Sequence, residues 1–141
     1  MATLTATAAQ STVPAKYRIN GAIIRVVDFT MNPALSAGDV IQMMRVPNGA
    51  VVTNVQLAMI DVPTTHTGVI TANVGDGNDT SAYAASVVLS GTLVALASIP
   101  SRGIGRSYSA EDTIDIQVAA ISAAGASGGL RLVVHYTMDN A

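Results

Sequence analysis

The stretch Arg45–Asp61, RVPNGAVVTNVQLAMID, predicts a tight turn followed by an unusually apolar strand. Pro47–Gly49 is the turn signal, because asparagine and glycine adopt positive φ at little cost. The ten residues Val51–Ile60 carry no charge and have apolar side chains at both alternating positions. We expect one face of this strand to carry Val51, Thr53, Val55, Leu57 and Met59. A sheet with one face in water keeps that face polar, so we expect the second face to meet other protein.

Seven further segments have the β-branched, alternating character of strands. They are Asn20–Met31, Val40–Val46, Val69–Gly75, Ala84–Leu89, Leu93–Ile99, Thr113–Ile121 and Leu130–Thr137. No segment predicts a helix. Eight antiparallel strands in two sheets are typical of a jelly roll, so we predict an all-β, eight-stranded antiparallel jelly-roll-like β-sandwich with an extended N-terminal segment. An immunoglobulin-like sandwich is the alternative, although the chain lacks the cysteines and tryptophan that mark its core.

Alternation within these segments predicts which side chains share a face. In the first strand, Ile24 and Val26 lie opposite Ile23, Val27 and Phe29. Later strands present Ile70, Ala72 and Val74, then Ile114, Ile116 and Val118, then Leu130, Leu132, Val134 and Tyr136 to single faces. The 22 uncharged residues 80–101 have the length of a membrane helix. Serine, glycine and proline interrupt them, however, so we expect two buried strands there.

The length of 141 residues suits one domain, but only 11% of the residues are charged, against about 25% in ordinary soluble domains. Seven basic and nine acidic residues give a formal net charge of −2. Chains with so little charge tend to associate, so we expect a permanent partner surface. We assign residues 17–141 to a single β-sandwich domain. Residues 1–16 are either a disordered tail or an arm that becomes ordered only in an assembly.

The composition argues against several classes of partner. Lys16 is the only lysine and the six arginines are scattered, so no basic patch for nucleic acid is expected. The chain has no cysteine, which excludes disulfides and thiolate metal sites. The N-terminal residues lack the pattern of a secretory signal, and we expect no membrane partner. Synthesis in a reducing cytoplasm fits these features.

Residues suited to catalysis or to cofactor binding are few. His66 is expected in a loop and His135 in the last strand, and no strand-to-helix nucleophile elbow accompanies them. Glu111 is the only glutamate. The segment Asp76–Asp79 gathers oxygen ligands but lacks the glycine and glutamate that an EF-hand needs at set positions, so we expect a turn. We therefore predict no catalytic residue, no bound cofactor and no metal site.

Arg102 and Arg106, in a glycine-containing loop, are the first candidates for contact with a partner. The loop lacks the third glycine and the helix of a dinucleotide site. Arginine pairs bidentately with carboxylates, so we expect both side chains to bind acidic groups on a partner, with plain solvent exposure as the alternative. At the end of the N-terminal arm, Lys16, Tyr17 and Arg18 are further expected contacts.

The order of these motifs resembles a known family. A strand that ends in Arg45-Val-Pro-Asn-Gly-Ala-Val-Val52, followed by a strand to Asp61, by Val74–Asp79 and by Asp112–Val118, resembles the head-decoration (cement) proteins of tailed bacteriophages. Among them, the chain is similar in size to the jelly-roll cement protein of a tropism-switching Bordetella phage. The resemblance covers about residues 20–138 as a pattern of turns and strands.

The resemblance implies a protein on the outer capsid surface of the virion. Its partners would be the major capsid protein, whose subunits it would bridge, and further copies of itself in a homodimer or trimer. Two other functions stay open. A carbohydrate- or receptor-binding jelly roll of a fibre or spike would need exposed aromatic rings, for which the chain offers four tyrosines and no tryptophan. An enzyme on a β-scaffold would need more histidine and glutamate.

Overall fold

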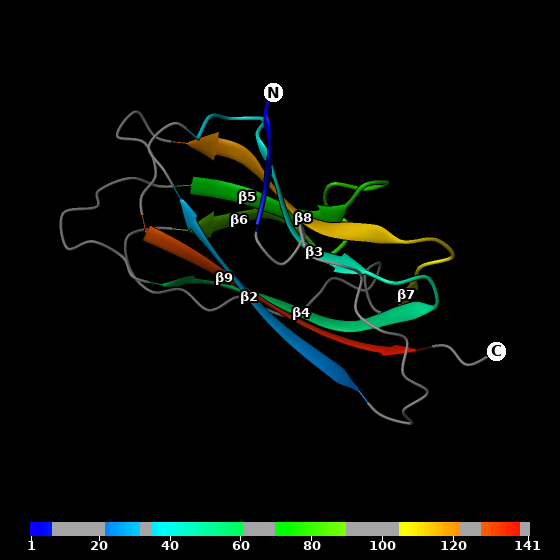
Figure 1. Cartoon of the computed structure of the whole chain (residues 1–141). Coiled ribbons are helices and arrows are strands. Elements are labelled where there is room, and N and C mark those ends of the chain that lie inside the picture. Colours follow the sequence, from blue (N-terminus) through cyan, green and yellow to red (C-terminus); the bar gives the residue numbers. More distant parts are fainter. Residues whose placement is uncertain (7–21, 32–34, 61–69, 90–104, 122–127, 139–141) are drawn as a thin grey trace.

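The computed structural model describes residues 1–6, 22–31, 35–60, 70–89, 105–121 and 128–138. Within these ranges all regular secondary structure consists of strands, which form two sheets stacked face to face (Figure 1). The described part of the chain holds no helix that is long and apolar enough to span a membrane. The prediction of an all-β sandwich is confirmed.

The larger sheet has five strands in the order β1-β3-β8-β5-β6. Their bounds are Thr3–Thr5 (β1), Val40–Val46 (β3), Asp112–Ile121 (β8), Ile70–Asp76 (β5) and Ala84–Leu89 (β6). The smaller sheet has four strands in the order β2-β9-β4-β7. Their bounds are Ile23–Met31 (β2), Gly128–Met138 (β9), Ala50–Ile60 (β4) and Arg106–Ser107 (β7). Neighbouring strands are antiparallel, except that β1 runs parallel to β3.

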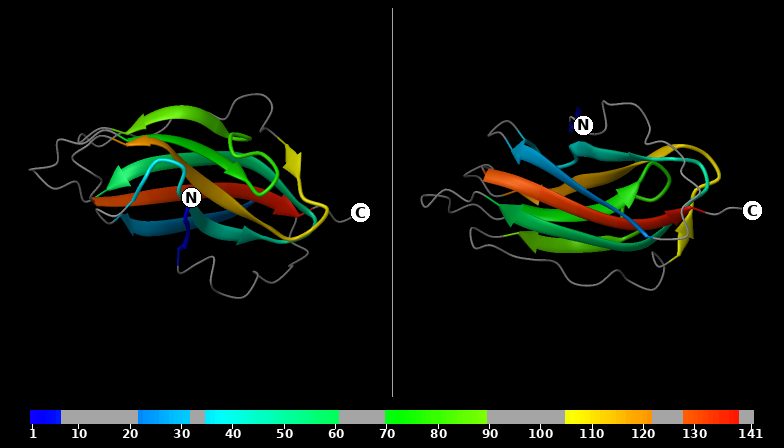
Figure 2. Two further views of the ribbon diagram at one scale, coloured as in Figure 1. Left: turned by 90° about the horizontal axis from the view of Figure 1, so that it is seen from above. Right: turned by 60° about the horizontal axis from the view of Figure 1, so that its bottom comes forward.

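The pairing pattern is that of a jelly roll, in which one long antiparallel hairpin is folded over itself. β5 and β6 form the end of the hairpin, and further out β4 pairs with β7, β3 with β8 and β2 with β9. Folding this ribbon brings β5 beside β8 in one sheet and β4 beside β9 in the other. Successive strands from β2 to β5 therefore alternate between the sheets, which Figure 2 shows in two further views.

The core lies between the two sheets and follows the predicted alternation. In the smaller sheet Val27, Leu132 and Leu57 lie side by side on three neighbouring strands, and all three are buried. The buried residues also include Ile70, Ala72, Val74, Ile114, Ile116, Val118, Leu130, Val134 and Tyr136, as predicted. Burying one large apolar side chain contributes about 1.5–3 kcal/mol, so these rows hold the two sheets together.

The predicted faces of β4 are partly wrong because the strand contains a β-bulge. Its register with β9 shifts between Val52 and Asn54. The buried side chains of the strand are Ala50, Val52, Val55, Leu57 and Met59. Val51 is half-buried and Thr53 is exposed, because the extra residue of a bulge reverses the facing that simple alternation predicts. The outer face of β4 includes exposed Gln56, so the second face of this strand is not buried within the described part of the chain.

β6 differs from the buried strand that the sequence predicts. Among the described strands only β5 lies beside it, so β6 is an edge strand there, and Ala85, Ser86 and Val88 are exposed. The second strand expected in the same uncharged stretch, Leu93–Ile99, lies outside the described residues.

Two strands, β1 and β7, were not predicted, because three and two residues are too short to show a period. β1 lies within the expected N-terminal arm. Val40 N donates to Ala2 O at 2.9 Å and Ala6 N donates to Gln42 O at 2.8 Å. Residues 1–6 thus pair with the larger sheet of their own chain, whereas residues 7–16 of the arm lie outside the described residues.

Candidate functional site

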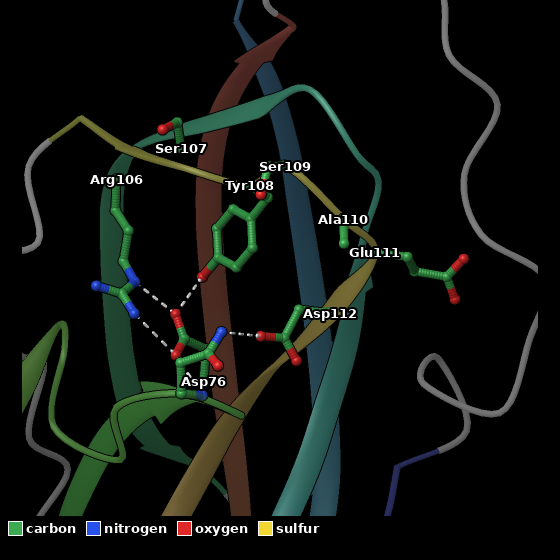
Figure 3. Close-up of a pocket in the computed structure, with 9 residues that line it drawn as sticks. Asp76, Arg106, Ser107, Tyr108, Ser109, Ala110, Glu111 and Asp112 are labelled. Atoms are coloured by element: carbon green, nitrogen blue, oxygen red, sulfur yellow. Dashed lines mark hydrogen bonds and ion pairs between the residues drawn. The ribbon is translucent and has the colours of Figure 1, made fainter.

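A buried polar cluster ties the two sheets together at one end of the sandwich (Figure 3). It consists of Asp76, Tyr83, Arg106 and Tyr108 and is called the Asp76 cluster below. Asp76 ends β5 in the larger sheet, whereas Arg106 begins β7 in the smaller one. Side chains two residues apart on an extended chain share a side, and Figure 3 shows Arg106 and Tyr108 both pointing toward Asp76.

The carboxylate of Asp76 accepts five hydrogen bonds. Arg106 donates from Nε to Oδ2 at 2.5 Å and from Nη2 to Oδ1 at 3.0 Å, which is a bidentate ion pair. The Tyr108 hydroxyl donates to Oδ2 at 2.9 Å. The backbone N–H groups of Asn78 and Asp79 donate to Oδ1 at 3.0 Å and 2.9 Å. These donors replace water around a carboxylate that is fully buried.

The charge on Asp76 is retained in spite of its burial. Burial alone would raise the pKa of Asp76, but hydrogen bonds from Arg106, Asp79, Tyr108 and Asn78 hold the pKa below its usual value. The hydrogen bond to Asp76 in turn raises the pKa of the Arg106 guanidinium. Both groups are therefore charged at neutral pH, and the pair acts as a clamp between the sheets.

The hydrogen bond between the two tyrosines of the cluster has a donor and an acceptor that can be assigned. Their hydroxyls are hydrogen-bonded to each other, and Tyr83 and Tyr108 are only 1% and 6% exposed. Burial raises the pKa of both phenols, so both keep their protons. A hydroxyl has one proton to donate. Because that of Tyr108 goes to Asp76, Tyr83 is the donor to Tyr108.

The two glycines that flank Asp76 lie in close contact with neighbouring groups, and the contact at Gly75 is with backbone atoms. A Cβ on Gly75 would lie 2.0 Å from the carbonyl oxygen of Asp79, and one on Gly77 would lie 2.8 Å from Oδ1 of Asp112. Asp79 Oδ1 accepts hydrogen bonds from the backbone N and the hydroxyl of Ser81 at 3.0 Å and 3.2 Å. The oxygen-rich segment is thus a turn with internal hydrogen bonds. Within the described ranges no group of three or more His, Asp or Glu side chains is placed to hold a metal ion.

A small pocket lies between this turn and the segment that joins β7 to β8. Its lining consists of Asp76, Asn78 and residues 106–112. Asn78 Nδ2 donates to Oδ2 of Asp112 at 3.5 Å. Figure 3 shows Glu111 pointing away from the cluster, and its carboxylate pairs with Arg45 Nη1 at 2.5 Å.

The lining of this pocket does not form a nucleophile–base pair. Such a pair needs a base, commonly histidine, within hydrogen-bond reach of a hydroxyl or thiol, and the described residues that line the pocket include no histidine. His135 lies on β9 in register with Ile24 and Asn54, on the outer face of the smaller sheet. His66 lies outside the described residues. The arrangement at this end of the sandwich is suited to holding the two sheets together.

Asp115 on β8 is a second buried carboxylate, with different surroundings. It is 8% exposed and lies in register with Gln42 of β3 and Gly75 of β5. Its Oδ1 has no hydrogen-bond partner within the described part of the chain. Burial raises the pKa of Asp115 to about 6; a hydrogen bond from Thr113 opposes this, and nearby carboxylates add to it.

Of the five residues predicted to contact a partner, Arg106 lies within the described ranges. Its guanidinium is engaged with Asp76, and 27% of its side chain is exposed. Lys16, Tyr17, Arg18 and Arg102 lie outside the described residues. Contact of these five residues with a partner stays a prediction, and for Arg106 the structure adds an internal role. Sequence reasoning missed this role because the ion pair joins residues 30 positions apart in two different sheets.

Solved structures of phage capsids contain chains with this fold. A chain in the structure "Capsid of Ralstonia phage GP4" matches with a TM-score of 0.77 and 21% identity, over 99% of both chains. A chain in the structure "Cyanophage Pam1 capsid asymmetric unit" matches with a TM-score of 0.57 and 23% identity, over 92% of this chain and 94% of that chain. At these identities the likeness shows the fold. Neither a protein-family model nor a curated protein matches the sequence.

Proposed function

We propose that this chain is a structural virion protein that binds the outer surface of a tailed-phage capsid and bridges neighbouring major capsid subunits. The observation that carries this proposal is the fold match to a chain of the phage GP4 capsid, which extends over 99% of both chains. The chain is made in the host cytoplasm and acts as a cement protein that stabilises the head. Its partners are the major capsid protein and further copies of itself, in a homodimer or trimer. It binds neither nucleic acid nor membrane and is not an enzyme.

The composition of the chain supports attachment to an assembly. Only 11% of its residues are charged, and Ile24, Val26 and Val88 each expose more than half of their surface. Low charge and exposed apolar groups favour association over dispersal in water. On a symmetric shell, simultaneous contacts of one particle with several sites add avidity to weak individual contacts.

The Asp76 cluster supports a mechanical role. A bridging protein transmits force between capsid subunits, so its two sheets must stay together under strain. The ion pair between Asp76 and Arg106 and the hydrogen bond from Tyr108 join the two sheets at one end of the sandwich. This polar clamp has the position that such a role needs.

A carbohydrate- or receptor-binding jelly roll of a virion fibre or spike is the second candidate. Sugar sites commonly need an accessible aromatic ring, because the ring face stacks on the sugar. Tyr83, Tyr108 and Tyr136 are 1%, 6% and 1% exposed and are not accessible for stacking. Tyr17 lies outside the described residues. The described tyrosines thus favour the cement function.

Co-sedimentation with phage heads tests the proposal. Purified chain is mixed with expanded empty heads that lack it, and the heads are pelleted. We expect saturable binding at a fixed number of copies per head, and heads that survive heating to a higher temperature once decorated. Binding to glycans or host cells without binding to heads would favour the fibre or spike function instead.

Removing positive charge from the predicted contacts tests which residues attach the chain. We expect Lys16→Ala, Arg18→Ala and Arg102→Ala to weaken head binding and to leave the unfolding temperature unchanged. Arg45→Ala is the control, because it removes an exposed arginine outside the predicted set. Arg106 is unsuitable for this test, because its loss leaves Asp76 without its ion pair. Equal head binding by all four variants would rule out the predicted contacts.

A further inference from the structure

The turn that precedes β3 holds the backbone of Ala2. The Ala2 nitrogen donates to Oδ1 of Asp39 at 2.9 Å, and the Ala2 carbonyl oxygen accepts from Val40 N at 2.9 Å. The other carboxylate oxygen, Oδ2, accepts from the backbone N of Ser36 at 2.9 Å. Asp39 is 6% exposed. A buried carboxylate therefore lies directly beside the nitrogen of the peptide bond between Met1 and Ala2.

The position of this carboxylate is set by backbone hydrogen bonds that do not involve β1. Asp39 N donates to Ser36 O at 3.1 Å and closes the turn, in which Gly38 has a φ of 95° that favours glycine. Gly38 N donates to Val118 O at 2.7 Å, and Val118 N donates to Asp39 O at 2.8 Å. β8 thus fixes the turn from one side, and Asp39 is in place to receive Ala2.

The Asp39 carboxylate is charged at neutral pH. The hydrogen bonds from the backbone of Ala2 and of Ser36 hold the pKa of Asp39 below its usual value, although burial opposes them. The positive charge of the terminal ammonium group also lowers this pKa. A cationic nitrogen at the position of Ala2 N would meet a full negative charge there.

Met1 adds no packing to this end of β1. Its side chain is 93% exposed, and Ala2 and Thr3 are exposed as well. Only further along does the strand contact the core, through partly buried Leu4 and through Ala6, which is 2% exposed. Methionine aminopeptidases remove a terminal methionine when the next side chain is small, because the pocket beside the bond to be cut is narrow. Ala2 meets this requirement.

We propose that the peptide bond between Met1 and Ala2 is a processing site, and that the ammonium group freed on Ala2 forms an ion pair with Asp39. Hydrolysis by a methionine aminopeptidase consumes one water. Its hydroxyl joins the Met1 carbonyl carbon, and the C–N bond to Ala2 breaks. Methionine leaves as a carboxylate, and the Ala2 nitrogen takes up two protons, one from the water and one that balances the proton lost by the methionine acid. This inference goes beyond the proposed cement function and does not depend on head binding.

Processing strengthens a contact that is already in place. The hydrogen bond from a neutral amide to Asp39 becomes a charge-assisted one, which is shorter and stronger. An ammonium group has three hydrogens to donate. One goes to Oδ1 of Asp39, and the others meet water because Ala2 is exposed. β1 has only three residues, so one stronger bond at its beginning shifts the balance between its docked and its open state.

Mass spectrometry tests the processing site. The chain made from this sequence in a bacterial cytoplasm should have lost one methionine residue and begin at Ala2. Ala2→Leu is the matched variant: its larger side chain at an exposed position should leave folding intact and block removal of Met1. Retention of Met1 on the unaltered chain would overturn the processing site.

Hydrogen exchange tests the ion pair. The chain that begins at Ala2 is compared with the same chain acetylated on the Ala2 nitrogen, because acetylation keeps an N–H donor and removes the charge. The amides of Val40 and Ala6, which bind Ala2 O and Gln42 O, report the opening of β1. We expect them to exchange about two- to fivefold more slowly with the free ammonium. The Tyr83 amide, which binds Val74 O, should exchange equally in both forms.

Asp39→Asn identifies the acceptor. The free and the acetylated forms are compared within the variant, so any cost of the substitution to the turn cancels. The difference in exchange should disappear in Asp39→Asn and persist in Asp28→Asn, which removes an exposed carboxylate in the other sheet. Equal exchange of the free and acetylated forms of the unaltered chain would overturn the ion pair. A difference that survives Asp39→Asn would overturn Asp39 as its acceptor.

Discussion

Asp76 and Asp115 are buried carboxylates on neighbouring strands of the same sheet, and their surroundings are opposite. Asp76 is 2% exposed, accepts five hydrogen bonds and has a lowered pKa. Asp115 is 8% exposed, has one oxygen without a partner among the described residues, and has a pKa raised to about 6. Burial disfavours the charge at both positions, so the difference lies in the donors. The hydrogen-bond partners of a buried acid, more than its depth, decide whether its charge stabilises the fold.

The largest effect is expected from removing the positive charge beside Asp76. Arg106→Gln leaves a fully buried carboxylate without its ion pair and should lower the free energy of unfolding by about 3–5 kcal/mol. Asp76→Asn should cost less, because 27% of the Arg106 side chain is exposed and its guanidinium can turn to water. Chemical denaturation at pH 7 measures both variants.

The double variant Arg106→Gln with Asp76→Asn sharpens this test. Because the two residues contact each other, the double variant should lose less stability than the sum of the two single losses. Equal losses in the single variants, or strict additivity, would mean that the ion pair is not what stabilises this end of the sandwich.

Asp115→Asn should act in the opposite direction and stabilise the protein at neutral pH. The pKa of Asp115 rises from 3.8 to about 6 on folding, so the fold favours the protonated form. The stability tied to this proton is fully present below about pH 4 and is lost as the pH rises through about 6. Asparagine stays neutral, so the variant should gain up to about 3 kcal/mol over the wild type at pH 7 and little at pH 4.

Free energies of unfolding measured at intervals between pH 4 and 7 decide this prediction. Asp28→Asn is the control, because Asp28 is exposed and its hydrogen bond to Arg131 lowers its pKa. Its loss should therefore give no gain at pH 7. If Asp115→Asn showed the same pH dependence as the wild type, another group would have to titrate in this range.

Smaller effects are expected at the two tyrosines, and their order tests the direction of the hydrogen bonds. Tyr108→Phe removes a donor to Asp76 and leaves the Tyr83 hydroxyl without its acceptor, so it should cost about 1–3 kcal/mol. Tyr83→Phe leaves the bond from Tyr108 to Asp76 intact and should cost about 0.5–1.5 kcal/mol. Thermal and chemical denaturation of both variants measure the difference. A larger loss for Tyr83→Phe would reverse the assigned direction.

The sequence predicts the fold well wherever stability depends on alternation along one strand. The rows that contain Val27, Ile70 and Ile114 are buried as the period-two pattern requires, and a chain with such strands at short intervals has few architectures open to it. Alternation fails at Thr53, because β4 has one additional residue there. Side chains before and after this residue therefore follow opposite alternation, and a single period-two pattern cannot predict both. Such a bulge has no signature in the apolar pattern itself.

The candidate site is less predictable, because it depends on how the two sheets stack. The turn at Asp76 is visible in the sequence, but its partner Arg106 is brought there by the folded hairpin and not by any local pattern. The same limit applies to the edge of β2. Exposure of Ile24 and Val26 follows from alternation, whereas the place of β2 at the edge of the described sheet follows only from the strand order. The local sequence predicts the strands and turns, whereas the sheet order decides which of their polar groups and edges have a neighbour.

The smallest expected effect concerns an ion pair next to the Asp76 cluster. The distance from Arg45 Nη1 to Glu111 Oε1 is 2.5 Å, the same as that from Arg106 Nε to Asp76 Oδ2. The side chains of Glu111 and Arg45, however, are 44% and 41% exposed. Water solvates both charges when the pair is broken, so Glu111→Gln should change the free energy of unfolding by less than about 1 kcal/mol. Chemical denaturation alongside Arg106→Gln compares two ion pairs that share a shortest N–O distance of 2.5 Å and differ in burial. If Glu111→Gln lost as much stability as Arg106→Gln, then the burial of Asp76 and its five hydrogen bonds would not make its ion pair more stabilising than an exposed one.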